Sequence, residues 1–168
     1  MNKQYIIELA DFNFWANNIV IEWLNQINNE QWEQPIISSF GSIKQTATHI
    51  VSAQKIWNDY WKDVPDPVFL SAEFKGTKNE LIEIWKKTSA DFRNFIEQYP
   101  EENYAQEIRF KWLRGGEGRM EFWQTFSHMI NHSTYHRGQL VTLLRQAGFT
   151  QPTSTDLATY YRMHQNNF

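Results

Sequence analysis

Four long stretches of this sequence repeat apolar residues at alternating steps of three and four positions, which constrains the fold more than any other feature. These stretches cover residues 3–27, 42–62, 78–98 and 120–147. The stripe of the first stretch consists of Tyr5, Leu9, Phe12, Ala16, Ile19 and Trp23. This spacing places side chains on one face of an α-helix, so each stretch predicts an amphipathic helix. Four such helices with modest connections favour an all-α four-helix bundle.

Local signals predict where these helices begin and what lies between them. The runs Ser42–Gln45 and Thr77–Glu80 have capping-box spacing, which is typical of a helix N-terminus. Proline and serine over residues 30–40 predict an irregular connection. Alternating apolar and polar residues at 108–112, followed by glycines, predict an extended segment or a short hairpin before the fourth long helix. A short last helix is expected over residues 155–165.

Size and composition favour a single domain, residues 1–168, with a well-filled core. Of the 168 residues 16% are aromatic, and aromatic side chains bury large apolar areas. The net charge of −3 and the lack of a Lys/Arg cluster argue against a nucleic-acid partner. No apolar run approaches the ~20 residues of a membrane span, and the first residues do not resemble a signal peptide. With no Cys in the chain, we therefore expect a cytoplasmic protein without a membrane partner.

Three of the five histidines lie in the fourth predicted helix at steps of four: His128, His132 and His136. Side chains four positions apart on a helix are neighbours, so two imidazoles can meet at one metal ion. On a helical wheel, His136 lies about 40° from the centre of the apolar face, His132 about 80° and His128 about 120°. His132 and His136 therefore face the core best, and His49 in the second helix is the natural third ligand. From spacing alone, hydrogen-bonded core histidines in a structural bundle remain the alternative.

The sequence lacks the motifs of several enzyme classes. Ser133 occupies the position at which an H-E-x-x-H zinc peptidase has its general-base Glu. The run Gly115–Gly118 lacks the Lys-Ser/Thr of a phosphate-binding loop, and no Gly-x-Ser-x-Gly nucleophile motif occurs. Because the chain has no Cys, any thiol that takes part in a reaction must come from outside the protein.

The run from His128 to Gln139, HMINHSTYHRGQ, resembles the signature of the DinB/YfiT-like metalloenzyme family. The segment Phe14–Asn17 and the stretch from Gly41 to His49 also resemble that family's first two helices. The resemblance covers nearly the whole chain. It implies a four-helix bundle with an unusual crossover, commonly assembled as a homodimer. It also implies a metal triad at His49, His132 and His136, the three residues that the helical wheel favours.

By the same resemblance, the cofactor is one divalent metal ion, nickel or zinc. The implied activity is a metal-dependent transfer of a thiol, or a hydrolysis, that acts on a small-molecule substrate. Characterised relatives use low-molecular-weight thiols such as bacillithiol or mycothiol. Three neutral imidazoles leave one coordination position open, so a metal-bound water or a substrate thiolate is the expected nucleophile. A non-catalytic binder of metal or a small ligand is the alternative.

Other residues are candidates for orienting the ligands or binding the substrate, because a ligating His usually donates its second N–H to a neighbouring group. They are His128, Asn131, Tyr135, Arg137 and Asn17. Arg137 suits an anionic substrate, and a salt bridge to Asp156 or another acid is its alternative role. Three tryptophans can line a pocket or simply pack in the core. They are Trp15, Trp57 and Trp61.

Overall fold

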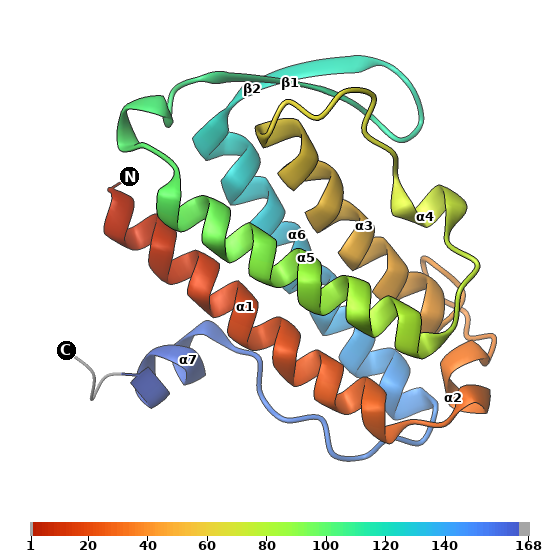
Figure 1. Cartoon of the computed structure of the whole chain (residues 1–168). Coiled ribbons are helices and arrows are strands. Elements are labelled where there is room, and N and C mark those ends of the chain that lie inside the picture. Colours follow the sequence, from red (N-terminus) through yellow and green to blue (C-terminus); the bar gives the residue numbers. More distant parts are fainter. Residues whose placement is uncertain (1, 165–168) are drawn as a thin grey trace.

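The computed structural model describes residues 2–164, and its framework is a bundle of four long helices (Figure 1). These helices are α1 (Lys3–Gln26), α3 (Ile43–Trp61), α5 (Lys78–Gln98) and α6 (Phe122–Gln146). Each begins and ends within two residues of its predicted range. Side chains of Asn2, Ser42 and Thr77 accept hydrogen bonds from backbone N–H groups at the starts of α1, α3 and α5. The predicted helical bundle is therefore confirmed.

The helices follow an order that periodicity alone does not give. α1 packs mainly against α5, and α3 packs mainly against α6 and also contacts α5. In Figure 1 the colours show α3 and α5 running in the same direction, opposite to α1 and α6. The connection between α3 and α5 must therefore return along the length of the bundle. It contains a short helix, α4 (Leu70–Glu73), which the sequence patterns do not predict.

A short hairpin precedes α6, as the alternation at residues 108–112 predicts. Strand β1 (Glu107–Lys111) pairs antiparallel with β2 (Glu117–Glu121), and Phe110 lies opposite Gly118. Figure 1 shows the hairpin across the ends of α3 and α6. Because Met120 belongs to β2, α6 begins two residues later than predicted.

Three short elements complete the described chain. The predicted irregular connection at 30–40 is wrong in part, because α2 (Asn29–Glu33) covers residues 30–33. Asn28 and Gln31 form a capping box at its start. A single 3₁₀ turn, Glu101–Asn103, follows α5. The expected last helix is present as α7 (Leu157–His164), which packs against α1. Position 165 of its predicted range lies outside the described residues.

Aromatic side chains fill much of the core at the hairpin end of the bundle. The ring of Trp61 lies 5.3 Å from that of Phe122, and its indole N–H donates to the Thr125 hydroxyl at 2.9 Å. Phe92 and Phe126 stack at 6.1 Å. Each of these large side chains is buried, so α3, α5 and α6 are held together directly under the hairpin. This rigid packing fixes the helix faces from which the site is built.

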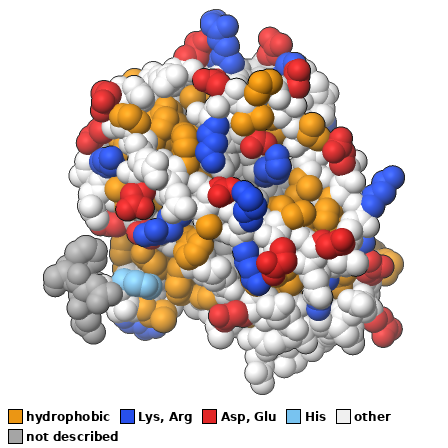
Figure 2. Space-filling model, viewed as in Figure 1, with side chains coloured by type: hydrophobic (Ala, Val, Ile, Leu, Met, Phe, Trp, Pro, Cys, Tyr) orange, Lys and Arg blue, Asp and Glu red, His pale blue; other side chains and the backbone are white. Residues whose placement is uncertain are grey.

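The surface carries both signs of charge. On the face shown in Figure 2, Lys and Arg side chains alternate with Asp and Glu, and apolar side chains lie between them. Within residues 2–164, no helix combines the length and the hydropathy that crossing a bilayer requires.

Candidate metal centre

Three histidine side chains from two helices meet inside the bundle. His49 extends from α3, while His132 and His136 extend from one face of α6 at consecutive helical turns. One ligand atom from each of the three lies within 4.8 Å of the others, and such a group can bind a metal ion. The ring centroids are 4.8 Å apart for His49 and His132, and 4.3 Å apart for His132 and His136. The helices α3 and α6, which pack closely, therefore bring together residues that are 83 positions apart in the chain.

The nitrogen atoms are spaced as ligands of one ion would be. The Nε2 atoms of His49 and His132 are 2.9 Å apart. Two nitrogens at this separation, each at the usual ~2.0–2.1 Å from a metal, subtend roughly 90° at the ion. That angle is suitable for adjacent ligands and leaves further coordination positions free.

A hydrogen bond fixes the ring of His136. Its Nδ1 lies 2.7 Å from the amide Oε1 of Gln139, one helical turn further along α6. Because an amide oxygen only accepts, Nδ1 carries the proton and Nε2 keeps its lone pair for a metal. The sequence patterns do not single out Gln139, although its position three residues after His136 is a neighbouring site on the same helix face.

The ring of His49 is held by an aromatic contact. Phe40, in the loop before α3, stacks on His49 at 4.3 Å and meets the edge of His136 at 5.4 Å. Phe40 thus covers two of the three histidines on one side. Nothing in the sequence predicts this contact, because Phe40 lies in a loop without periodicity. The Nδ1 of His132 is buried and has no hydrogen-bond partner among the described residues.

The environment keeps the three imidazoles neutral. Burial, and then repulsion by His136, lowers the pKa of His49 to about 4. Burial lowers the pKa of His132 to about 3, with further lowering by the neighbouring histidines. Burial also lowers the pKa of His136, and the hydrogen bond with Gln139 opposes this. Near neutral pH the nitrogens of this group therefore have lone pairs available for a metal.

His128 lies outside the group, as the helical wheel predicts. Its ring centroid is 5.7 Å from that of His132 and 5.6 Å from that of Trp57. Burial lowers the pKa of His128. It lines a cavity beside the three histidines and is not one of the three converging ligands.

The other candidate residues lie in two different environments. Asn131 and Tyr135 are exposed, and the Tyr135 ring lies 4.9 Å from that of His136 without a hydrogen bond to it in the described residues. Asn17 is fully buried and donates to Gln54 and Ser89 at 2.9 and 3.0 Å. Within residues 2–164, no hydrogen bond joins either asparagine to an imidazole of the group.

Arg137 has neither of its expected roles, because its side chain is 1% exposed and lies in the core. It donates to the side-chain oxygens of Asn13 at 2.7 Å, Asn17 at 3.1 Å and Thr134 at 2.9 Å. No salt bridge to Asp156 or another acid is present among residues 2–164. Burial lowers the pKa of Arg137 to about 9. Arg137, the residue after His136, therefore joins α6 to α1.

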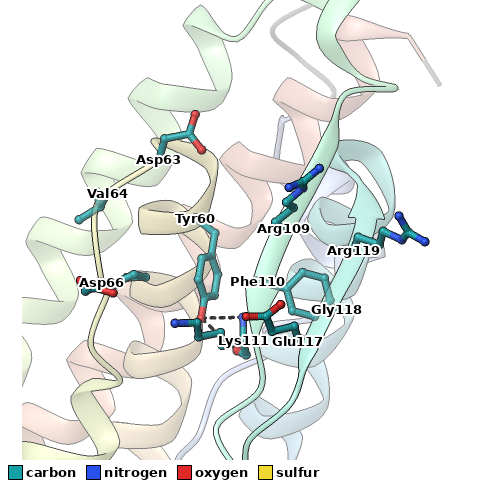
Figure 3. A pocket seen from close by; sticks show the side chains of 11 residues that line it. Tyr60, Asp63, Val64, Asp66, Arg109, Phe110, Lys111, Glu117, Gly118 and Arg119 are labelled. Carbon is teal, nitrogen blue, oxygen red and sulfur yellow. Dashed lines mark hydrogen bonds between the residues drawn. The ribbon is translucent and has the colours of Figure 1, made fainter.

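Two cavities adjoin the candidate metal centre. A broad cleft of about 560 Å³ reaches His49 and has a polar rim that includes Glu33, Lys44 and Gln45. A narrow cavity of about 130 Å³ reaches both His49 and His132. The largest cavity described, about 690 Å³, has charged walls between the end of α3 and the hairpin (Figure 3) and touches none of the three histidines.

Of the three tryptophans considered as pocket walls, only Trp57 lines one of these cavities. Trp15 packs on Tyr160 of α7 with ring centroids 5.5 Å apart. Trp61 is buried in the aromatic core.

Comparisons with known proteins match the chain over most of its length. Residues 1–167 match the model of the DinB family. The sequence is 26% identical over 168 residues to Protein DinB of Bacillus subtilis (strain 168), with 96% of each chain covered.

Two solved structures are similar in fold. A DinB-like protein from Bacillus cereus ATCC 10987 has a TM-score of 0.66 and 20% identity, and 83% of this chain and 90% of that one are covered. A DinB-like protein from Bacillus subtilis has a TM-score of 0.68 and 16% identity, with 88% and 97% covered. At these identities the two structures support the fold alone.

Proposed function

The chain belongs to the DinB family, and we propose that its three histidines hold one divalent metal ion at which a small-molecule substrate reacts. The observation that carries this proposal is the convergence of three neutral imidazoles from α3 and α6. Imidazole nitrogen suits nickel and zinc, the two metals that we propose. Structural zinc sites use four protein ligands, whereas catalytic sites keep a position open. The group contains three ligands within residues 2–164, which favours an open, catalytic site.

The donor set fits such an ion. The residues supply no negative charge to the site, because all three ligands are neutral, so a bound ion would keep its full charge. When bound, the ion supplies Lewis-acid chemistry, which lowers the pKa of a coordinated thiol or water. The chain's own contribution is to orient the ligands: Gln139 fixes the tautomer of His136, and Phe40 fixes the plane of His49.

We favour thiol transfer over hydrolysis within this proposal. Hydrolysis by a zinc peptidase uses a Glu next to the metal as a general base. No carboxylate belongs to the ligand group described here. Glu33, which lines the adjoining cleft, is exposed and paired with Lys44 at 2.8 Å. A thiol, with an ordinary pKa of about 8.5, is far more acidic than water and can lose its proton to solvent without such a base. Because the chain lacks Cys, the thiol is a separate small molecule, such as a low-molecular-weight thiol.

A specific observation keeps the non-catalytic alternative open to test. The two Nε2 atoms at 2.9 Å are also at hydrogen-bond distance, so His49 and His132 can satisfy each other without a metal. In a purely structural bundle, metal removal would leave every property of the protein unchanged. A binder without catalysis would load metal and turn over nothing.

Activity measurements with and without a chelator test the catalytic proposal. The nickel- or zinc-loaded protein is incubated with a low-molecular-weight thiol and a chromogenic aryl halide, and separately with a chromogenic ester. We expect thiol transfer that is lost with the chelator and returns when metal is added. Chelator-insensitive rates, or rates equal to those of the His136→Ala variant, would refute a catalytic metal centre.

We also propose, from the family resemblance, that the protein is a cytoplasmic homodimer. Light scattering during size-exclusion chromatography measures its mass directly. A mass near twice the 20.1 kDa of one chain supports the dimer, and a mass near 20.1 kDa refutes it.

A further inference from the structure

The narrow cavity beside the candidate metal centre has a size and a lining that the proposed function does not explain. Its volume is about 130 Å³, and its walls come from α3, α4, the hairpin and α6. His49 and His132 form one side of it. Any group inside it therefore lies next to the imidazoles that would hold the metal.

Most of the other residues that line this cavity are aromatic or aliphatic. Trp57 of α3 meets the ring of Phe110 of β1 edge-on at 4.9 Å, and Phe110 meets Trp112 edge-on at 4.7 Å. The edge of His128 closes the side next to Trp57. Lys111 and two serines also line the cavity, but an ionised group placed against the aromatic rings would lose its hydration, so the aromatic side of the cavity suits an apolar group.

The hairpin wall is fixed before any ligand arrives. The hydroxyl of Tyr60 accepts from the Lys111 backbone N–H at 3.1 Å and donates to the Lys111 carbonyl at 3.0 Å, as Figure 3 shows. The ring of Phe110 lies over Gly118, where an added Cβ would be only 2.5 Å from it. Glycine at this strand position therefore lets the Phe110 ring lie flat across the hairpin. The cavity is preformed, which reduces the entropy that ligand binding costs.

The size of the cavity defines its occupant. An apolar cavity of ~150 Å³ in another protein holds one benzene molecule. We propose that the 130 Å³ cavity is a specificity subsite for a benzene-sized apolar group of the substrate, whose reactive atom then lies at the three histidines. The affinity of the cavity for an apolar ring does not depend on a metal. The placement of the reactive atom rests on the proposed function.

Binding of fluorobenzene to the metal-free protein, followed by ¹⁹F NMR, tests whether the cavity binds an apolar ring. We expect saturable binding to the wild type. Ala53 lines the cavity on α3, so Ala53→Leu fills it and abolishes binding. Ala90→Leu, on α5 and outside the cavity, is the matched control and keeps the wild-type affinity. No saturable binding to the wild type, or equal binding to the folded Ala53→Leu protein, would overturn the subsite.

A variant outside the helices guards against misfolding of Ala53→Leu. Trp112 follows β1 and is 45% exposed, so its loss removes one wall of the cavity without opening the helical core. We expect Trp112→Ala to weaken fluorobenzene binding at least about fivefold, because the ring loses buried contact area. Unchanged affinity in this variant would also count against the subsite.

Two hydroxamates and the zinc-loaded protein test whether a ring in the cavity and a group at the three histidines can belong to one ligand. Both carry the same metal-binding group, but only benzohydroxamate adds a ring, so we expect it to bind about tenfold or more tightly than acetohydroxamate. The ratio of the two hydroxamate affinities should approach one in the Ala53→Leu variant. Equal affinities in the wild type would overturn the subsite while the metal site stands. If zinc or both hydroxamates fail to bind, the proposed function fails, and the fluorobenzene result alone decides the subsite.

Discussion

Gln139 offers a sharp test of how the chain orients its candidate metal ligands. Its amide oxygen accepts from Nδ1 of His136 at 2.7 Å and so keeps Nε2 unprotonated. Gln139→Met preserves the length of the side chain and removes this acceptor. Losing a partner of this kind typically lowers metal affinity about 10- to 100-fold, which corresponds to about 1.4–2.8 kcal/mol. The free energy of unfolding of the metal-free protein should change by only about 1 kcal/mol, because one partly exposed neutral hydrogen bond is lost.

The assay is a zinc titration at pH 7 in competition with a chromogenic chelator. Gln139→Glu keeps an acceptor at the same place and should retain the wild-type affinity or exceed it. Gln146→Met, on the exposed end of the same helix, controls for the substitution itself and should bind zinc as the wild type does. If Gln139→Met also has the wild-type affinity, the hydrogen bond to His136 does not prepare the ligand, and the reasoning is refuted.

Two further predictions concern the metal-free protein. The pKa values of His49 and His132 are lowered to about 4 and 3, so the unfolded chain binds more protons below the ordinary value of 6.5. The free energy of unfolding should stay constant above pH 6.5 and decrease as the pH drops from 6.5 towards 4. Urea titrations with equal midpoints at pH 7 and pH 5 would contradict this. Arg137→Ala leaves two buried asparagine oxygens without their donor, which should cost about 3 kcal/mol and lower Tm by about 6 °C or more. The exposed Arg145→Ala is its control, and equal Tm values for both variants would show that Arg137 does not join α6 to α1.

The long helices were predictable because their apolar periods and caps agree with their tertiary packing. The short ones were not. α2 spans only Asn29–Glu33, which is too short for a period to show, and its capping box has Asn28 where the motif usually has Ser or Thr. α4 has no side-chain cap at all, so no local signal marks it. The direction of α5 relative to α3 depends on how the connection between them folds, which no periodicity encodes.

The part of the candidate site that depends on helix geometry alone was predictable from the sequence. The steps between His128, His132 and His136 define which rings face inward, and the wheel separates His128 from the other two. Contacts made by segments outside those helices were not predictable from the sequence. Phe40 reaches His49 from a loop, and the cavity walls depend on how the hairpin lies across α3.

Arg137 shows the limit of reasoning from residue type. A guanidinium next to a candidate metal ligand predicts an anionic substrate, but the side chain of Arg137 turns into the core and donates to amide and hydroxyl oxygens. Arg137 lies on the face of α6 that packs against α1, and it therefore binds residues of α1 in the core. The pairing of α1 with α6 had to be known before that face could be interpreted.

Metal content per chain, measured by elemental analysis after zinc or nickel loading and desalting, tests the convergence of the three imidazoles most directly. We predict one ion per chain in the wild type and in His128→Ala, and close to none in His136→Ala and His49→Ala. His136→Ala protein that is folded and still holds one ion per chain would contradict the assignment of this metal centre.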